Sequence, residues 1–334
     1  MTVIFAKAYN FELSWCSLLR AQLFPNHKCK YSKIMSEEVS FRYRVPLKTK
    51  ILNIGRRIFM LRIFENWLVK RTLNKRVSSF WCRLIPPEYL YPKNSYRVSK
   101  IEGATYKLDI SNVVDHGAFW GYQDKATSFF LSRLNKGHTI FDVGANIGII
   151  SVNAAARSKQ VISIEPDKTN FARLTENLRL NNTTNVTTLN IGLGSRKEVK
   201  KLYQVVESNP GMNRIMDREL DLPYNEIQIE TLDSITQTLN ISKIDVIKID
   251  TEGYEMNILK GSNYCIDKFK PAMMLEVDNS LLQAQSSSAV ELLGFIKGKG
   301  YNIYDITNGK TINNLDGGIP SHFDVWCSPI VGTN

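Results

Sequence analysis

The pattern of apolar and polar residues becomes regular beyond about residue 100. Short apolar runs rich in β-branched residues alternate there with stretches of helical spacing, which is typical of strands and helices in succession. The expected strands are 139–143, 160–165, 186–193, 244–250, 272–277 and 301–305, and the expected helices are 147–157, 168–181, 253–261 and 287–298. Strands joined by helices pair in parallel, with right-handed crossovers. The pattern therefore predicts an α/β fold with a doubly wound, mostly parallel sheet of about seven strands.

Two segments depart from this alternation. The final run, "HFDVWCSPI" (322–330), follows the loop "TNGKTINNLDGGIPS" and not a helix, so we expect this strand to lie antiparallel to its neighbour. Within residues 195–231, "LYQVVES" and "EIQIETL" have the composition of extra strands. The loop "NPGMNRIMDREL" between them is a candidate lid or acceptor pocket.

Residues 51–71, "ILNIGRRIFMLRIFENWLVKR", combine apolar side chains at near-helical spacing with several arginines and lysines. One interpretation is a basic amphipathic helix on an anionic membrane. The other is a helix packed on the main domain with its charges in solvent. The apolar residues cover more than one helix face, which favours the packed helix. They are Ile51, Ile54, Ile58, Leu61, Phe64 and Leu68.

Composition divides the chain into three parts. Residues 1–34 are expected to be a poorly ordered extension, or to precede a true start at Met35, which is followed by "SEEV". Residues 35–99 are expected to be a basic, helical segment that ends in the proline-rich linker "LIPPEYLYPKN" (84–94). Residues 100–334 are expected to form the α/β domain.

The net charge of +11 is concentrated at the N-terminal end. Residues 1–100 hold 20 Lys and Arg against five Asp and Glu, whereas the rest of the chain holds 23 against 27. The mildly acidic α/β domain argues against a nucleic-acid partner and leaves peripheral contact with an anionic membrane open. Five dispersed cysteines indicate reduced thiols, and there is no clean signal peptide or long apolar run. We expect a cytoplasmic protein, with attachment to the inner membrane surface as an option.

The stretch "TIFDVGANIG" (139–148) has the pattern of a parallel strand that ends in a turn open to a ligand. Glu165 ends the next strand, where a carboxylate accepts bonds from ribose hydroxyls; a dinucleotide and S-adenosylmethionine both have such a ribose. Charge separates the two ligands, because Asp142 would repel a pyrophosphate and attract a sulfonium and an ammonium. The glycine spacing is also GxxxG and not GxGxxG. The turn therefore predicts S-adenosylmethionine.

Three motifs in order give the chain a resemblance to a known family. "FDVGANIGIIS", "VISIEPDKTNFARLTENLRLNN" and "IKIDTEGYEMNILKG" resemble the FkbM family of S-adenosylmethionine-dependent methyltransferases, over roughly residues 100–330. The resemblance implies a class I methyltransferase fold and methyl transfer, usually to oxygen, on sugars, polyketides or other small acceptors.

The resemblance also implies where the cofactor binds. By match to the first motif, Asp142, Gly144, Asn146 and Gly148 are expected to line its methionyl side. Glu165 matches the ribose-binding acid, Asn190 and Gly192 are placed to contact adenine, and Asp250 lies beside the expected sulfonium. The structural alternatives are an ordinary strand–helix turn for the glycines and a capping role for Asn190. Candidate substrate contacts are Tyr122, Asn213, Arg214, Glu276 and Asp278.

The segment "IKIDTEGYE" carries the candidate catalytic residues, Asp250 and Glu252. Methyl transfer is an in-line displacement that needs the acceptor aligned with the methyl group and one hydroxyl proton removed. Carboxylates do this directly or by holding a divalent ion, and Glu276 and Asp278 are placed to join them; the sequence leaves a metal open. The structural alternative is that acids favour the first turn of a helix. The other candidate bases are His116 and His322.

Two functions remain for the structure to separate. The favoured one is O-methylation of a small-molecule or saccharide acceptor, such as a glycolipid or polysaccharide precursor. The alternative is a protein that binds nucleic acid or a membrane through its first hundred residues, with a domain that modifies RNA or is inactive. Trp67 and Trp81, among arginines, have the chemistry to stack on bases or to lie at lipid headgroups.

Overall fold

The computed structural model describes residues 47–72, 79–122, 124–205, 210–216, 218–315 and 318–330, and the expected extension 1–34 lies outside them. The chain divides into two compact units, Met1–Arg97 with Leu108–Tyr122, and Val98–Lys107 with Gln123–Asn334. We call them the N-terminal unit and the sheet unit. This division differs from a single boundary near residue 100, because Leu108–Tyr122 belongs to the N-terminal unit.

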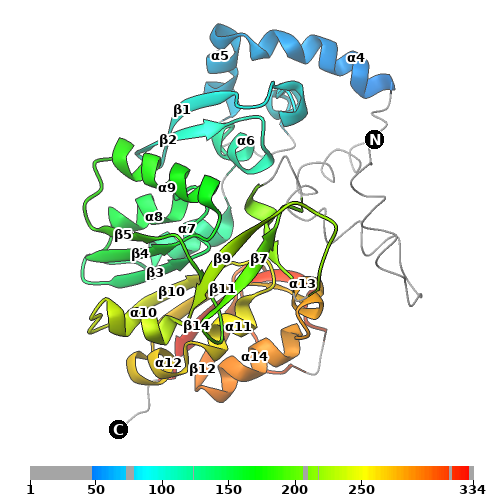
Figure 1. Ribbon diagram of the computed structural model, residues 1–334. Helices are drawn as coiled ribbons and strands as arrows, with labels where there is room; N and C mark the ends of the chain where they lie inside the picture. The colour runs from blue at the N-terminus through cyan, green and yellow to red at the C-terminus, as the bar shows by residue number, and fades with distance from the viewer. Residues whose placement is uncertain are drawn as a thin grey trace. The chain divides into compact units, whose positions relative to one another are not determined.

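The sheet unit is built on an eight-stranded sheet in the order β13-β12-β14-β11-β10-β3-β4-β5 (Figure 1). Its strands are β3 (Thr139–Val143), β4 (Gln160–Ile164), β5 (Val186–Leu189), β10 (Val246–Ile249), β11 (Ala272–Asp278), β12 (Tyr301–Asp305), β13 (Lys310–Thr311) and β14 (His322–Pro329). The strands from β5 to β11 are parallel, and β14 lies antiparallel between β11 and β12. The doubly wound sheet with an antiparallel last strand is confirmed. The short β13 makes the observed strand number eight.

Helices cover both faces of this sheet, each over its own apolar core. β3 and β10 are buried along their whole length, as central parallel strands are. Alternation sends Ile140 to a core shared with α7 (Lys125–Ser132) and α8 (Ile149–Ala155), and Phe141 to the opposite core. The remaining helices of the unit are α9 (Lys168–Leu180), α10 (Leu232–Thr238), α11 (Glu255–Lys260), α12 (Asn263–Phe269), α13 (Asn279–Ala284) and α14 (Ala289–Gly298). All but α9 contribute to the Phe141 core.

A second, four-stranded sheet lies within residues 192–230, in the order β6-β9-β7-β8. Its elements are β6 (Gly192–Leu193), β7 (Glu198–Tyr203), η4 (Pro210–Met212), β8 (Arg214–Ile215) and β9 (Tyr224–Glu230). β9 falls where an extra strand was expected. β7 begins earlier than "LYQVVES", and residues 206–208 of that segment lie outside the described residues. The expected strand 186–193 is wrong as one element, because it divides into β5 of the main sheet and β6 of the second.

The sequence did not predict the two-stranded sheet of β1 (Tyr96–Ile101) and β2 (Ala104–Asp109). Its turn has φ +50° at Glu102 and +89° at Gly103, the left-handed backbone that two-residue hairpin turns require.

The N-terminal unit holds α4 (Leu47–Arg56), η1 (Arg57–Met60), α5 (Arg62–Thr72), η2 (Trp81–Leu84), η3 (Glu88–Leu90) and α6 (Val113–Phe119). The helix expected over 51–71 is broken at Leu61, whose extended backbone (ψ 128°) separates η1 from α5. The proline-rich segment is packed, since Ile85 and Tyr91 are buried. In the described part of the chain, no helix combines the length and apolarity needed to cross a membrane.

Candidate active site

Charged side chains of the sheet unit gather on one face, at the carboxyl ends of β3, β10 and β11. They pair across neighbouring strands as Asp142 with Lys248, Glu276 with Asp324, and Asp278 with His322. Lys248 lies opposite Met274, two residues before Glu276, so alternation places all three pairs on the same face. Asp250, two residues after Lys248, continues this face. Open parallel sheets bind their ligands at this edge.

The turn after β3 requires left-handed backbone. The φ angle is +77° at Gly144, +50° at Asn146 and +87° at Gly148, values that glycine and asparagine tolerate best. A Cβ on Gly144 would lie 1.9 Å from the carbonyl oxygen of Asp250, so this glycine lets the turn contact the loop after β10. The Asn146 N–H donates to Glu165 Oε2 at 2.8 Å. The turn therefore lies between two of the predicted cofactor acids, Glu165 and Asp250.

Asp142 is 0% exposed, and its carboxylate is bound within the protein. Its Oδ2 accepts a hydrogen bond from Ser151 Oγ at 2.5 Å, and Ser151 accepts one from Ser163 Oγ at 2.7 Å. Its Oδ1 lies 3.5 Å from Lys248 Nζ. The expectation that Asp142 faces a ligand ammonium is therefore corrected: Lys248 balances its charge, and any effect on a ligand passes through these partners.

Lys248 joins the turn to the loop after β10. Its Nζ donates to the Gly144 carbonyl oxygen at 3.0 Å and lies 3.3 Å from Asp250 Oδ2. Burial disfavours the ammonium, but attraction to Asp250 and Asp142 outweighs burial and raises the pKa of Lys248. The Asp250 side chain is 46% exposed, so Asp250 is the acid of this network that faces solvent. Lys248 was not among the residues expected from the sequence, although a lysine within the apolar strand "VIKI" is a signal for a buried ion pair.

Glu165 follows β4 and is 5% exposed. Its carboxylate accepts hydrogen bonds from the N–H groups of Asn146 at 2.8 Å and Asp167 at 2.9 Å. Burial outweighs these bonds and raises the pKa of Glu165 to about 7. This carboxylate therefore titrates near neutral pH.

The two residues expected at adenine differ in environment. Asn190 is exposed next to Glu165, and its Nδ2 donates to the Glu165 carbonyl oxygen at 2.8 Å. Gly192 is buried in β6, and a Cβ there would lie 2.5 Å from Ile229 Cδ1. Packing of the second sheet therefore explains why residue 192 is glycine, whereas Asn190 stays a candidate for contact with a base.

We expect the Glu165→Gln variant to flatten the pH dependence of stability between pH 4.5 and about 7. The pKa of Glu165 is higher in the folded chain than in the unfolded chain. Its contribution to the free energy of unfolding is therefore full below pH 4.5 and is lost as pH rises through about 7. Urea unfolding at a series of pH values measures this slope. Glu176→Gln is the control, since Glu176 is 34% exposed and pairs with Lys107. An equal slope in wild type and Glu165→Gln would contradict the prediction.

Asp250 and Glu252 lie in a loop and not in the first turn of a helix, because α11 begins only at Glu255. The φ angle is +56° at Glu252 and +100° at Gly253, which is not helical backbone. Glu255 Oε1 accepts hydrogen bonds from the N–H groups of Thr251 at 2.9 Å and Gly253 at 3.2 Å. The explanation by helix-start preference therefore holds for Glu255, and it does not account for Asp250 and Glu252.

The loop acid Glu252 meets a residue of the second sheet. Its Oε2 lies 3.7 Å from Arg214 Nη2, with side chains 22% and 9% exposed, respectively. Burial raises the pKa of Glu252 to about 7, with Arg214 acting against it and Asp250 adding to it. Asn213 donates from Nδ2 to Asp167 Oδ2 at 3.1 Å. The structure thus brings the predicted substrate residue Arg214 beside the predicted catalytic acid Glu252. Asn213 instead bonds to Asp167, whose N–H donates to Glu165.

Glu276, Asp278 and His322 form a second charged group at the same edge. His322 Nδ1 lies 3.8 Å from Glu276 Oε1 and 3.5 Å from Asp278 Oδ2. Burial and the charge of Asp250 raise the pKa of Glu276 well above its usual value. Burial by itself raises the pKa of Asp278, but hydrogen bonds from His322 and Ser280 outweigh burial and lower this pKa to about 2. Asp278 is therefore held as the cap of α13, while Glu276 belongs with the loop acids.

Asp324 belongs to this group and was not expected from the sequence. Burial, followed by the charges of Asp124 and Asp250, raises the pKa of Asp324 to about 7. The signal was its place in "HFDVW", where an acid interrupts an apolar strand.

Two candidate residues lie in the N-terminal unit. His116 is buried, its Nε2 hydrogen-bonds to the Pro86 carbonyl oxygen at 2.8 Å, and burial lowers its pKa to about 4. These partners give His116 a structural role. Tyr122 is half-buried in the same unit and stays a prediction.

Part of the chain matches a known protein family. Residues 142–303 match the family model of the methyltransferase FkbM domain. This part of the chain is an FkbM methyltransferase domain. It contains the turn after β3, Glu165, Lys248 and the acids from Asp250 to Asp278, whereas His322 and Asp324 lie beyond it.

One curated protein and two solved structures share modest similarity with the chain. Methyltransferase 1 of Beauveria bassiana is 24% identical over 143 residues, which cover 36% of this chain and 57% of that protein. The structure of methyltransferase FkbM from Methylobacillus flagellatus has a TM-score of 0.42 and 18% identity, covering 82% of this chain and 60% of that chain. M. jannaschii TYW2, solved in complex with AdoMet, has a TM-score of 0.35 and 18% identity, with coverage of 71% and 86%. The chain spans less than two thirds of the first two proteins.

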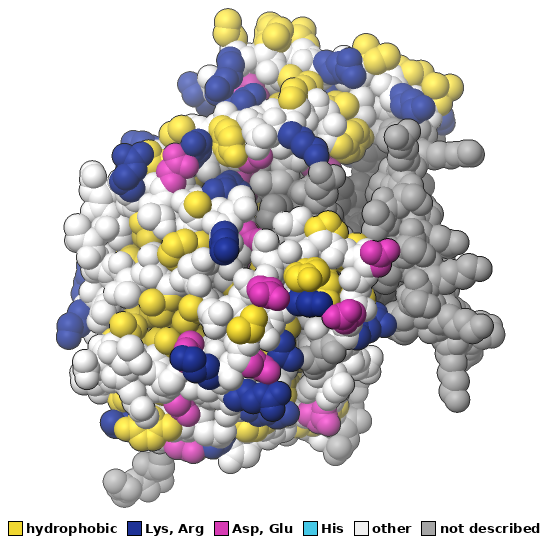
Figure 2. All heavy atoms as spheres, viewed as in Figure 1, with side chains coloured by type: hydrophobic (Ala, Val, Ile, Leu, Met, Phe, Trp, Pro, Cys, Tyr) yellow, Lys and Arg dark blue, Asp and Glu magenta, His cyan; other side chains and the backbone are white. Residues whose placement is uncertain are grey.

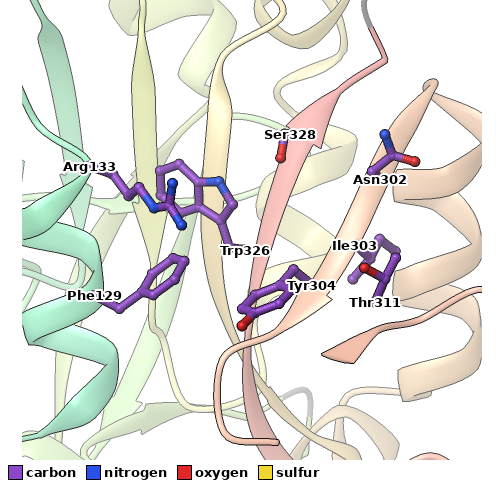
Figure 3. A pocket seen from close by; sticks show the side chains of 8 residues that line it. All are labelled: Phe129, Arg133, Asn302, Ile303, Tyr304, Thr311, Trp326 and Ser328. Atoms are coloured by element: carbon purple, nitrogen blue, oxygen red, sulfur yellow. The ribbon is translucent and has the colours of Figure 1, made fainter. Parts of the chain in front are cut away.

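Among the described residues, no three His, Cys, Asp or Glu side chains are grouped closely enough to hold a metal ion. A separate open hollow of about 250 Å³ lies on the sheet unit (Figure 3), lined by Phe129, Arg133, Asn302, Ile303, Tyr304, Thr311, Trp326 and Ser328. Figure 3 shows the Arg133 side chain beside the Phe129 ring, with Cζ 4.6 Å from the ring centre. Trp326 pairs with Met274, so this hollow lies toward the amino ends of the parallel strands, away from the acids.

Proposed function

We propose that the chain transfers a methyl group from S-adenosylmethionine to a hydroxyl of a sugar, a glycolipid or polysaccharide precursor, or another small metabolite. The match to the FkbM domain supports methyl transfer. One observation supports the cofactor: acids outnumber cations around the exposed Asp250. The acids are Asp142, Asp250, Glu252, Glu276, Asp278 and Asp324, and the cations beside them are Lys248, Arg214 and His322.

Mutual repulsion among these acids makes the edge suited to a cationic ligand. Burial is the largest cause of the raised pKa of Glu252, Glu276 and Asp324, and the charge of Asp250 raises each of these pKa values further. A cation bound among them offsets this repulsion, whereas a pyrophosphate adds negative charge to it. S-adenosylmethionine presents a sulfonium and an ammonium together. The preference for a cationic ligand, which the sequence assigned to Asp142, is therefore better assigned to Asp250 and the acids around it.

The arrangement of strand ends supports a matching set of contacts. Glu165 offers a carboxylate to the ribose, Asn190 is exposed beside it for the base, and the turn at Gly144 leads to Asp250 for the cationic end. When bound, S-adenosylmethionine supplies a methyl group on its sulfonium. Asp250 and Glu252 would orient the acceptor hydroxyl and take its proton. With a pKa of about 7, Glu252 suits general base catalysis near neutral pH.

Basic side chains beside the loop and strand acids favour a polar acceptor. Arg214 and His322 both carry N–H donors within contact distance of the loop or strand acids. Donors and acceptors interleaved in this way match a molecule with several hydroxyl groups. This supports a saccharide or a similarly hydroxylated metabolite.

Calorimetry with the purified full chain tests the cofactor. We expect S-adenosylmethionine and S-adenosylhomocysteine to bind and a nicotinamide dinucleotide not to bind. Release of S-adenosylhomocysteine is then assayed with sugars, glycolipids and small hydroxylated metabolites. Uptake of the dinucleotide with no uptake of either S-adenosyl ligand would overturn the proposal.

Asp250→Asn is expected to lower kcat, measured at saturating S-adenosylmethionine, by about 100-fold. The amide keeps the shape of the side chain and removes the carboxylate that positions and deprotonates the acceptor. Asp267→Asn is the matched control, because Asp267 is a 54% exposed acid of α12 that pairs with Lys299. Full turnover in Asp250→Asn would remove Asp250 from the catalytic assignment.

A further inference from the structure

Helix α4 buries polar residues and exposes apolar ones, which is the reverse of a typical helix in a soluble domain. Its buried residues are the polar Asn53 and Arg56, and Arg56 donates to the Arg83 carbonyl oxygen from Nε at 2.9 Å and from Nη2 at 2.6 Å. Its apolar residues face outward, with exposed fractions of 74% for Leu47 and 71% for Ile54. A helix that packs its apolar stripe on a core shows the opposite arrangement.

The connector η1 and helix α5 continue this arrangement. Ile63 is 81% exposed, whereas Glu65 is fully buried and binds Arg97, with Arg97 Nε 2.6 Å from Glu65 Oε1. Leu68 is the apolar residue of α5 that is buried. The apolar residues left exposed across these three elements are Leu47, Ile51, Leu52, Ile54, Ile58, Leu61, Ile63, Phe64 and Trp67. The helix expected to pack its apolar residues instead presents them to the outside.

Positive charge is interleaved with these apolar side chains. Residues 47–72 contain a single acid, Glu65, and Arg97 pairs with it inside the unit. Figure 2 shows Lys and Arg among the hydrophobic side chains over α4 and α5, at the top of the view. The exposed cations are Lys48, Lys50, Arg57, Arg62, Lys70 and Arg71. We call the outward face of α4, η1 and α5 the basic apolar face.

We propose that the basic apolar face docks the protein on an anionic lipid bilayer. A bilayer takes up aliphatic side chains below its headgroups and holds lysines and arginines at its anionic surface, which is what this face offers together. Trp67 is 40% exposed, and the Arg71 guanidinium lies 4.7 Å from its ring centre, a pairing suited to the headgroup level. Docking by this face goes beyond the proposed methyl transfer and does not depend on it.

Two other partners fit the face less well. A nucleic acid offers phosphates to the lysines and arginines but no apolar phase for Ile54 or Ile63. A second copy of the chain would cover the aliphatic side chains, but it would bring six cations on each face together, and like charges in contact are unfavourable. The combination of aliphatic exposure and positive charge selects the lipid surface.

Vesicle sedimentation with the full chain tests the proposal. We expect the protein to pellet with vesicles that contain phosphatidylglycerol and to stay in solution with phosphatidylcholine alone, with binding that weakens as salt rises. Changing Ile51, Ile54 and Ile63 together to Glu is expected to abolish binding. Changing Val199, Val290 and Ile330 to Glu is the matched control, since these residues of the sheet unit are 50–57% exposed and the charge change is equal.

The cationic part of the face is tested separately. Lys48→Gln with Lys50→Gln is expected to weaken partitioning about 25-fold, because each lysine near an anionic surface contributes about fivefold. Lys260→Gln with Lys310→Gln, both exposed on the sheet unit, is the control. Three results would overturn the proposal: no pelleting of the wild type with anionic vesicles, equal pelleting of the isoleucine variant, or a wild-type dimer that the isoleucine variant makes monomeric in sedimentation velocity.

Discussion

The Gly144→Ala variant is expected to lose about 3–5 kcal/mol of unfolding free energy, together with uptake of S-adenosylmethionine. The added carbon would lie 1.9 Å from the Asp250 carbonyl oxygen, a backbone atom that moves only if the loop after β10 moves. The φ of +77° at residue 144 also disfavours alanine. Both effects fall where the turn after β3 meets Asp250. This cost is a large share of the 5–15 kcal/mol that typically stabilises a domain. Where the variant still folds, we expect the turn after β3 and the loop after β10 to move apart, which disrupts the site.

Urea unfolding followed by circular dichroism measures the loss, and calorimetry measures the cofactor. Gly300→Ala is the matched control, because Gly300 has φ +80° and no atom within 4 Å of an added Cβ. That variant isolates the cost of left-handed backbone, which is about 1–2 kcal/mol. If Gly144→Ala were as stable as Gly300→Ala, the close contact with Asp250 would not exist in solution.

Lys248→Met is expected to lower the free energy of unfolding by about 3–5 kcal/mol, because it leaves the carboxylate of a fully buried Asp142 without its cation. The change also frees Asp250 and the Gly144 carbonyl oxygen, both of which Lys248 contacts. We therefore expect weaker binding of S-adenosylmethionine in this variant even under conditions where it is folded.

Lys107→Met supplies the comparison, since its ion pair with Glu176 has side chains 36% and 34% exposed and is worth about 0–1 kcal/mol. Adding Asp142→Asn to Lys248→Met removes the unpaired charge and is expected to recover part of the loss. A double variant no more stable than Lys248→Met alone would show that the Asp142 charge is not what Lys248 balances.

The regular part of the fold was readable because its strands are short, apolar on both faces and separated by helical spacing. β3 has the bounds expected for it, since five consecutive buried residues end at a glycine that must adopt positive φ. The expected strand 186–193 failed at Asn190, where the chain leaves the main sheet. Gly192 and Leu193 pair with residues 229 and 230 of β9, and no local pattern reveals a partner so far along the chain.

The residues of the candidate site were likewise predicted only in part from the sequence. Asp250 and Glu252 were identifiable because both follow an apolar strand at the edge where such sheets bind ligands. Lys248, Ser151 and Asp324 were missed, since their partners lie on other strands and helices. Lys248 and Asp142 are 106 residues apart in the chain and adjacent in the sheet. Burial then reversed the expectation for Asp142, which became an internal anchor, with Asp250 left as the exposed acid.

The sequence by itself determined the order of strands and helices, the acids at the strand ends and the concentration of positive charge near the N-terminus. Local spacing shows which residues share one face of an element. It does not show what covers that face. Only the tertiary structure decided that Lys248 neutralises Asp142, that Arg214 meets Glu252, and that α4 and α5 bury polar residues and expose apolar ones. Each of these depends on contacts between segments distant in the chain, and those contacts set which charges and which apolar groups remain in water.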